Sequence, residues 1–309
     1  MRMLVVGAGA LGGYFGARLA QAGRDVTFLV RPARARQLAE TGLRVVSPHG
    51  DFAIVPRLVT TDTLDGPYDV VLLATKAYTL DAAMTDIAPA IGPQTAILPT
   101  LNGLRHLDAL AARFGAERLL GGTVIVIATI GPDGEIRQLM PPHEIAFGER
   151  SGGTSARVQA IATFMQGAGF TARASENILH DMWEKWVALA TAAGLTCLMR
   201  GTVGDIMAAP GGQETALAML AECRAVATAQ GYAPRPAFMA RATAMVATPG
   251  SPFSASMLRD LEGRAETEAD HIIGDLLARA DAAGVATPLL RLAYCHLGTY
   301  AARRARGGI

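Results

Sequence analysis

The amino-acid sequence predicts two domains, an α/β domain with a parallel sheet followed by an all-α domain. The chain has 309 residues, and at roughly 150 residues per domain this length accommodates two domains. Short apolar runs alternate with helical patterns in the first half of the chain, which is typical of a parallel sheet covered by helices. Beyond Ser175 only long helical patterns follow. We expect the first domain to span residues 1–170 and the second residues 171–309.

Apolar runs and turn signals place the elements of the first domain. We expect a hairpin from residues 43–47 and 52–55, because Pro, His, Gly and Asp at 48–51 favour a turn. Residues 135–139 and 144–147 flank a Met-Pro-Pro-His segment, which predicts two antiparallel edge strands joined by a turn. The remaining strands are expected at 4–6, 26–30, 69–74, 95–98 and 122–130, and helices at 11–22 and 33–41.

The second domain contains only helical periodicity in its sequence. We expect helices at residues 176–199, 213–230, 236–247, 256–283 and 288–302, and no strand. Their apolar faces offer a surface for a homodimer.

Composition and charge exclude several classes of protein. The formal net charge is +1 and the arginines are scattered along the chain, so no basic stripe predicts nucleic-acid binding. The longest stretch without charge, residues 87–104, contains three prolines and does not predict a membrane span. Cys197, Cys223 and Cys295 are widely spaced and form no motif with histidines, which argues against a disulfide framework or a metal site. We expect a cytoplasmic protein without a metal.

A glycine motif lies between the first predicted strand and the first predicted helix. In G-x-G-x-x-G motifs at such a turn, the glycines allow a tight bend, close approach of a pyrophosphate and helix packing. The motif predicts a Rossmann-type dinucleotide-binding domain, although a purely structural glycine-rich turn is the alternative. Its residues are Gly7, Ala8, Gly9, Ala10, Leu11 and Gly12.

The end of the second strand indicates which dinucleotide is bound. An NAD-dependent enzyme usually has an acidic residue there for the ribose hydroxyls, whereas this chain has Arg31. A guanidinium favours the 2′-phosphate, so we expect NADPH as the cofactor. Arg34 and Arg36 follow on the next helix and are either further phosphate contacts or ordinary solvated residues.

Two polar residues follow neighbouring predicted strands. Lys76 comes after the apolar run 70–74, and Asn102 after the next strand. The carboxyl ends of parallel strands form the edge where open α/β sheets bind ligands. We expect both residues to face the cofactor, although Asn102-Gly103 is also a common turn signal.

Lysine is rare in this chain, since 26 of its 28 basic residues are arginine and the two lysines are Lys76 and Lys185. Arginine serves a solvated surface equally well but does not release its proton. Lys185 lies between Trp183 and Trp186 on a predicted buried helix, where desolvation lowers a lysine pKa toward a value useful for proton transfer. It is a candidate general acid, and a lysine that reaches solvent or pairs with a carboxylate is the alternative.

With these residues placed, the chain resembles the ketopantoate reductase family over essentially its whole length. The glycine motif and Arg31 resemble the family's NADPH contacts, and Lys76 and Asn102 its residues around the cofactor, with Asn102 also contacting substrate. Lys185 lies where the family has its catalytic lysine. Glu268, and Ser256 twelve residues before it, resemble the catalytic glutamate and the substrate-binding serine. A helical N-cap is the alternative for Ser256, because one straight helix would separate the two by about 18 Å.

The resemblance implies NADPH-dependent reduction of a 2-keto acid to a 2-hydroxy acid, with 2-dehydropantoate (ketopantoate) as the first candidate, in pantothenate and coenzyme A biosynthesis. Leu189, Ala193 and Phe253 stand where the family has substrate-binding asparagines. A different 2-keto acid therefore stays open. A non-catalytic NADPH sensor, and a related dehydrogenase of 3-hydroxy acids, are the alternatives to this function.

Overall fold

The computed structural model describes residues 1–308, and these residues form two compact units. The first unit comprises Met1–Leu101 and His106–Leu179, and the second comprises Asn102–Arg105 and the chain from His180 onward. The units divide later than the expected boundary at residue 170, because strand β10 (Thr171–Ala174) pairs with β9 (Ile136–Glu149) inside the first unit. The sequence pattern predicts no strand in this segment.

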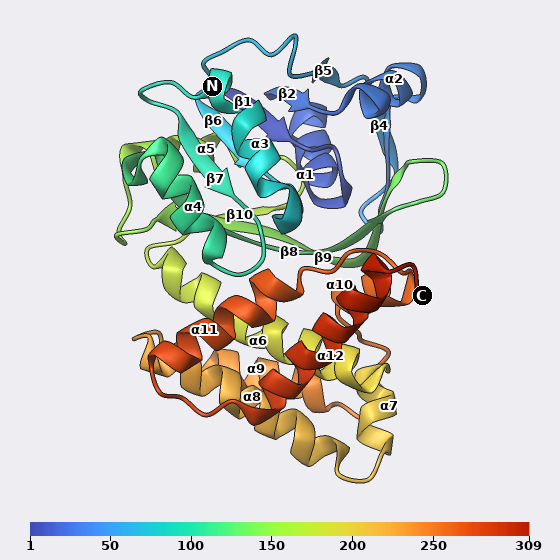
Figure 1. Ribbon diagram of the computed structural model, residues 1–309. Coiled ribbons are helices and arrows are strands. Elements are labelled where there is room, and N and C mark those ends of the chain that lie inside the picture. The colour runs from blue at the N-terminus through green and yellow to red at the C-terminus, as the bar shows by residue number, and fades with distance from the viewer. Residues whose placement is uncertain (309) are drawn as a thin grey trace. The chain divides into compact units, whose positions relative to one another are not determined.

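A five-stranded parallel sheet lies at the centre of the first unit (Figure 1). Each strand is short, the central strands are mostly apolar and buried, and β1 lies in the middle with β2 and β6 as its parallel neighbours. Runs that are buried on both faces are typical of such sheets. The predicted α/β fold is thus confirmed. The strand order is β5 (Arg57–Val59), β2 (Asp25–Leu29), β1 (Arg2–Val6), β6 (Val70–Leu73) and β7 (Ala96–Pro99).

A second sheet contains the predicted hairpin of β3 (Leu43–Val46) and β4 (Phe52–Ile54), which pair antiparallel. The expected pair of edge strands at 135–147 is wrong. These residues belong to the single strand β9, and both of its parts pair with β8 (Leu120–Ile130). Residues 139–142 bulge out opposite Ile127, because the register shifts there. Prolines are tolerated at such a bulge, so Pro141-Pro142 does not reverse the chain.

Helix α1 (Ala10–Gln21) contacts strands of both sheets and organises the core of the first unit. Tyr14 and Phe15 of this helix are fully buried, as are Phe28 of β2 and Phe147 of β9. The other helices of this unit are α2 (Pro32–Thr41), α3 (Leu80–Asp86), α4 (Arg105–Phe114), whose first residue belongs to the second unit, and α5 (Ala156–Met165).

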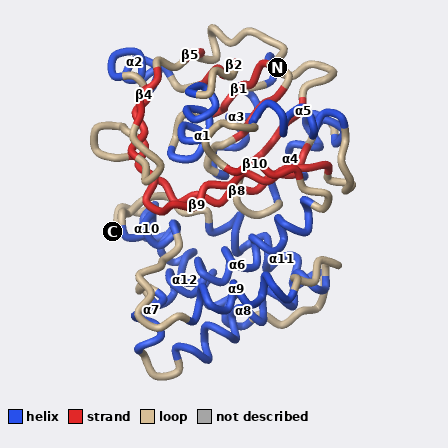
Figure 2. The backbone as a smooth tube through the Cα atoms, turned by 180° about the vertical axis from the view of Figure 1, so that it is seen from behind, coloured by secondary structure: helices blue, strands red, loops and turns tan. Residues whose placement is uncertain are grey.

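The second unit consists of helices and loops, and residues 180–308 form no strand (Figure 2). The long helix expected at 256–283 is interrupted, because Arg264 adopts a left-handed conformation (φ 57°) soon after α10 ends. The chain then forms a π-helical turn, Asp270–Gly274, that continues into α11. The helices are α6 (Ile178–Met199), α7 (Val203–Ala208), α8 (Gly212–Ala229), α9 (Pro236–Ala247), α10 (Ser256–Glu262), α11 (Asp275–Ala282) and α12 (Pro288–Ala305).

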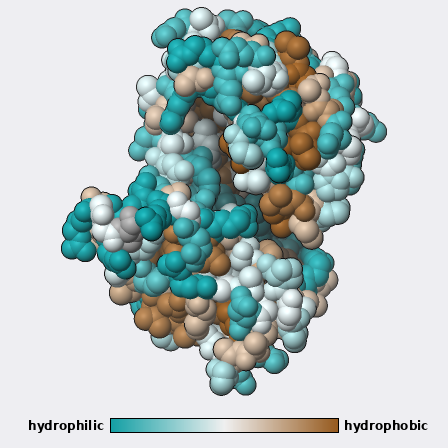
Figure 3. Space-filling view, turned by 90° about the vertical axis from the view of Figure 1, so that its right-hand side faces the viewer, coloured by the Kyte–Doolittle hydropathy of each residue, from teal (hydrophilic) through white to brown (hydrophobic). Residues whose placement is uncertain are grey.

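On the face shown in Figure 3, hydrophobic residues form separate groups among hydrophilic residues. None of the helices formed by residues 1–308 is both long and apolar enough to span a membrane.

Candidate active site

The glycine motif joins β1 to α1 through a tight turn. Gly7 is left-handed (φ 93°), and its N–H donates to the Leu29 carbonyl at 3.0 Å. A Cβ on Gly12 would lie 2.2 Å from the Gly7 carbonyl oxygen, so only glycine permits this packing. At Gly9, the N-cap of α1, a Cβ would meet nothing within 4 Å. The N-terminus of α1 therefore has the open approach that a phosphate needs.

Lys76 lies at the same edge of the parallel sheet as the glycine turn. It is exposed and follows β6 by three residues. A Cβ on Gly7 would lie 3.6 Å from the Ala74 carbonyl oxygen and 3.8 Å from Thr75 Cγ2. The structure thus brings the segment carrying Lys76 beside the predicted pyrophosphate turn.

The two arginines near the end of β2 have different environments. The Arg34 guanidinium donates to the Ala8 carbonyl (3.4 Å) and the Gly134 carbonyl (3.0 Å), and its burial lowers its pKa. Arg31 is exposed at the N-cap of α2. Arg34 therefore braces the glycine turn, and Arg31 is the better placed of the two for a ligand phosphate.

Lys185 lies on α6, which is buried over most of its length. Between residues 182 and 197 every residue is buried except Lys185, Ala188 and Leu189, which are partly exposed. Burial lowers the pKa of Lys185 to about 8, and the negative charge of Glu268 opposes this change. An ammonium with this pKa is protonated at neutral pH and can still release its proton.

Glu268 is only 6% exposed and lies just before the π-helical turn. Its backbone carbonyl accepts hydrogen bonds from the N–H groups of His271 (3.1 Å) and Ile272 (3.0 Å). Within the turn, the Ile272 carbonyl accepts a buried hydrogen bond of 2.8 Å from Trp186 Nε1 on α6. Lys185 and Glu268, 83 positions apart in the sequence, are thus close enough in the structure for the charge of Glu268 to raise the pKa of Lys185.

Asn102 belongs to the second unit, with Lys185 and Glu268, although it follows a strand of the first. The next residue, Gly103, is left-handed (φ 74°), and a Cβ there would lie 2.5 Å from the His271 carbonyl oxygen and 3.9 Å from the Trp186 ring. The Asn102-Gly103 loop therefore packs against the π-helical turn. A turn that only reverses the chain needs no such tertiary contact.

Ser256 is the first residue of α10 and lies farther from Lys185. The N–H of the preceding residue, Ala255, donates to Thr196 Oγ1 at 3.4 Å. Thr196 is eleven residues beyond Lys185 on α6, which corresponds to about 16 Å along the helix axis. Because α10 ends at Glu262, Ser256 and Glu268 do not lie on one straight helix. The separation of about 18 Å expected for such a helix therefore does not apply to them.

The sequence did not predict the roles of Trp186 and Gly103, which connect α6 and the Asn102-Gly103 loop to the π-helical turn. The Trp-x-x-Trp pattern around Lys185 predicted burial, but the partner of the indole N–H lies 86 residues away. A contact of that kind has no local signature in the sequence.

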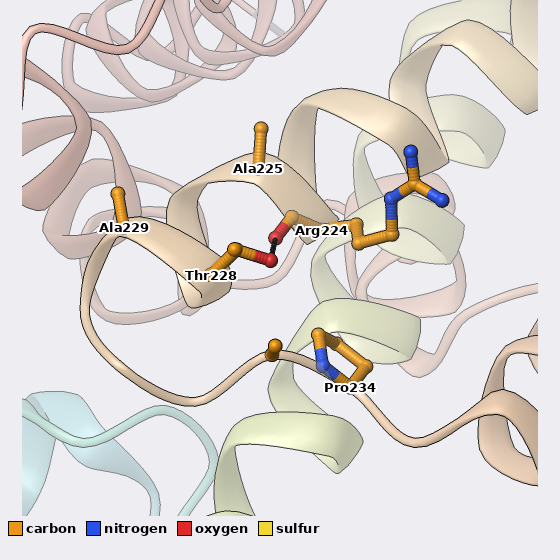
Figure 4. Close-up of a pocket in the computed structure, with 6 residues that line it drawn as sticks. Arg224, Ala225, Thr228, Ala229 and Pro234 are labelled. Atoms are coloured by element: carbon orange, nitrogen blue, oxygen red, sulfur yellow. Dashed lines mark hydrogen bonds between the residues drawn. The ribbon is translucent and has the colours of Figure 1, made fainter.

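A surface depression of about 560 Å³ lies elsewhere in the second unit, beside the C-terminal end of α8 (Figure 4). The Thr228 hydroxyl, which lines it, donates to the Arg224 carbonyl at 2.9 Å. Arg224 is the one charged residue among those lining the depression, so they supply no acid–base pair for catalysis. They are Arg224, Ala225, Thr228, Ala229, Ala233 and Pro234.

Two family models match the chain and together cover most of it. Residues 3–152 match "Ketopantoate reductase PanE/ApbA", and residues 177–301 match "Ketopantoate reductase PanE/ApbA C terminal". An uncharacterised oxidoreductase, YkpB of Bacillus subtilis, is 36% identical over 98% of this chain and 100% of its own length. A 2-dehydropantoate 2-reductase of Mesorhizobium japonicum is 29% identical over 75% of this chain and 77% of its own.

Solved structures share the same fold. A 2-dehydropantoate 2-reductase from Geobacter metallireducens superposes with a TM-score of 0.88 at 30% identity, over 97% of this chain and 99% of its own. A D-mandelate dehydrogenase solved with NADH and anilino(oxo)acetate gives the same TM-score at 21% identity, over 99% of this chain and 100% of its own.

Proposed function

Because the chain belongs to the ketopantoate reductase family, we propose that it reduces a 2-oxo acid to the 2-hydroxy acid with NADPH. It is an oxidoreductase, and its family uses a nicotinamide dinucleotide. The observation that carries the proposal is the pair formed by Lys185, whose pKa is near 8, and the buried carboxylate of Glu268. A buried ammonium of this kind suits a carbonyl reduction, which needs one proton for each hydride.

The residues of the first unit fit the cofactor. The open N-terminus of α1 at Gly9 suits the pyrophosphate, and the exposed Arg31 suits the 2′-phosphate of NADPH. Lys76, beside the glycine turn, adds a second positive charge near the phosphates. When bound, the reduced nicotinamide supplies a hydride to the ketone carbon.

The residues of the second unit supply the proton. Lys185 Nζ donates its proton to the carbonyl oxygen as that oxygen becomes the hydroxyl of the product. Before the transfer, the ammonium stabilises the negative charge that develops on the oxygen. Glu268 keeps Lys185 protonated at neutral pH, because its charge raises the pKa of the ammonium. Asn102 is assigned to both the cofactor and the substrate, and Ser256 to the carboxylate of the substrate.

Ketopantoate is the first candidate substrate, which would place the enzyme in pantothenate biosynthesis. A 2-keto acid with a more apolar side chain is the second candidate. Leu189, one turn beyond Lys185, is partly exposed and offers no hydrogen bond from its side chain. An apolar side chain would therefore be accommodated next to Lys185.

We further propose a cytoplasmic homodimer. Cys197, Cys223 and Cys295 are free thiols, which fits a reducing compartment. One structural relative is a dimeric ketopantoate reductase from Staphylococcus aureus.

The function is tested by following NADPH oxidation with a panel of 2-keto acids that contains ketopantoate and phenylglyoxylate. We expect turnover with at least one acid and a preference for NADPH over NADH. Tight NADPH binding without turnover on the whole panel would contradict a reductase and favour a sensor. Oxidation of 3-hydroxy acids with NADP⁺ would favour the related dehydrogenase.

A further inference from the structure

Trp186 connects the two elements that carry the proposed catalytic pair. Its indole is only 1% exposed, and its N–H donates to the Ile272 carbonyl at 2.8 Å. Lys185 is the preceding residue on α6, and Glu268 lies four positions before Ile272. The hydrogen bond therefore ties the turn of α6 at Lys185 directly to the segment that begins with Glu268.

The segment held by Trp186 has an unusual backbone. Residues Asp270–Gly274 form a π-helical turn, which contains more residues per turn than an α-helix and often occurs at functional sites. At the first residue of the turn, the Tyr294 hydroxyl donates to Asp270 Oδ1 at 2.8 Å. A Cβ on Gly274 would lie 3.0 Å from that hydroxyl oxygen. The π-helical turn is therefore fixed between Trp186 and Tyr294.

The indole itself is held in place by its neighbours. The Trp183 and Trp186 rings lie 4.9 Å apart, and Trp183 stacks on Tyr232 with centroids 5.5 Å apart. The Arg279 guanidinium lies 5.5 Å from the Trp186 ring and 5.7 Å from the Trp183 ring. With this packing Trp186 has little freedom, so its N–H can define the position of the turn.

Several charged groups belong to the elements around the pair. On α6, Asp181 and Glu184 both accept hydrogen bonds from Arg235. Arg279 of α11 bonds to Asp275 of the same helix. Burial and the charge of Arg105 lower the pKa of His271 in the π-helical turn. Glu268 is the group whose charge acts on Lys185 itself, so its position is the one that matters most for the proton donor.

We infer that Trp186 is a positioning residue, whose N–H···O=C bond to Ile272 fixes the π-helical turn and holds the Glu268 carboxylate at a set distance from the Lys185 ammonium. The inference rests on the proposed function, because the Lys185–Glu268 pair is catalytic only if the protein is a reductase. Loss of the bond lets the turn move and weakens the effect of Glu268 on Lys185.

The test uses the fact that the chain contains two lysines. Protein labelled with ¹³Cε-lysine gives two side-chain signals, which a Lys76→Arg variant assigns. The titration of Lys185 is then followed by NMR in the absence of substrate and cofactor, so it requires no turnover. We expect Glu268→Gln to lower the Lys185 pKa, and Trp186→Phe to lower it by part of that amount.

The double variant Trp186→Phe/Glu268→Gln separates positioning from a general structural role. If Trp186 acts through Glu268, the double variant titrates like Glu268→Gln alone. Trp183→Phe is the matched control, because it changes the neighbouring indole of the same cluster, and we expect it to leave the Lys185 titration unchanged. The inference would be overturned if Trp186→Phe left the Lys185 pKa unchanged. It would also be overturned if Trp186→Phe shifted that pKa equally in the wild-type and Glu268→Gln backgrounds.

A second replacement covers the case in which Trp186→Phe does not fold. The chain has two tryptophans, so in the Trp183→Phe background all tryptophan can be replaced by benzothienylalanine, which exchanges the N–H for sulfur at nearly constant ring size. The same fall in the Lys185 pKa is expected, and an unchanged titration would refute the role of the N–H.

Activity then distinguishes the two proposals. We expect kcat of Trp186→Phe to fall by about tenfold or more, since small displacements of catalytic groups are costly, while KM for NADPH stays constant. If the wild type reduces no 2-oxo acid, the proposed function fails and the titration still decides the role of Trp186. If the wild type turns over but the titration does not move, only the inference fails.

Discussion

Lys185 carries the same charge as the arginines of this chain, but it can release its proton near physiological pH. Almost all the cations of this chain are arginines, which hold their protons at any physiological pH. Lys185 combines partial burial, a nearby carboxylate and a pKa of about 8. At the scale of single residues, the proposed chemistry depends on this one amine.

Replacing Lys185 by alanine removes the proposed proton donor. We expect kcat for 2-oxo acid reduction to fall by about 100-fold or more, the usual contribution of a general acid. NADPH affinity should change little, because the residues proposed to bind the phosphates of the cofactor, which are the glycine turn, Arg31 and Lys76, belong to the first unit. Steady-state kinetics and fluorescence titration with NADPH check the two expectations, and unchanged turnover would remove Lys185 from the mechanism.

The pKa of Lys185 also predicts the pH dependence. Reduction requires the ammonium form, so kcat should be constant below about pH 8 and decrease above it. The oxidation of the 2-hydroxy acid requires the neutral amine, so its rate should increase through the same range. A profile measured in both directions tests the sign, and parallel curves would contradict an acid–base role.

Arg31 is expected to select the phosphorylated cofactor. The variant Arg31→Ala should lose about 10- to 100-fold in NADPH affinity, because a hydrogen bond between charged groups contributes roughly 1.5–3 kcal/mol. NADH affinity should change little. Arg44→Ala, which removes another exposed arginine of the first unit, serves as the control. Equal losses for both cofactors would show that Arg31 does not read the 2′-phosphate.

At the scale of elements, the turn between β1 and α1 contains two glycines with different expected roles. Gly12 is required for packing, and Gly9 is proposed to lie beside the pyrophosphate. Gly12→Ala places a Cβ 2.2 Å from the Gly7 carbonyl oxygen and should destabilise the fold by about 1–3 kcal/mol, as overpacking does. Gly9→Ala meets no neighbour, so stability should be unchanged while NADPH binding weakens. Urea unfolding and cofactor titration measure both effects. Full NADPH affinity in Gly9→Ala would place the pyrophosphate elsewhere.

Elements with a strong local pattern were predictable from the sequence. The buried runs of β1, β2, β6 and β7 and most helices of the second unit match their expected places. Strand β9 and the helix expected at 256–283 were not predicted correctly. Pro141-Pro142 is accommodated in a bulge because β8 pairs on both sides of it, and the break after Glu262 depends on the backbone of Arg264. The first outcome follows from a pairing partner distant in the sequence, and the second from a left-handed backbone that a residue other than glycine rarely adopts.

At the scale of the whole molecule, the residues proposed to carry the reaction are divided between two units. The first carries the glycine turn, Arg31 and Lys76, and the second carries Lys185 and Glu268. The sequence indicated an α/β domain followed by a helical domain, and the structure groups Asn102 with the second unit although it follows a strand of the first. Gly103 packs against the π-helical turn of the second unit, a tertiary contact that strand order alone does not reveal.

Hydride transfer to the 2-oxo acid is the central claim for the molecule, and isotope transfer measures it most directly. Wild-type protein is incubated with NADPH carrying deuterium at both C4 positions and with the best acid of the panel, and the product is analysed by mass spectrometry. We expect one deuterium at C2 of the 2-hydroxy acid, and none above background with Lys185→Ala over the same time. Product without deuterium at C2, or no product while NADPH binds, would contradict the proposed reaction.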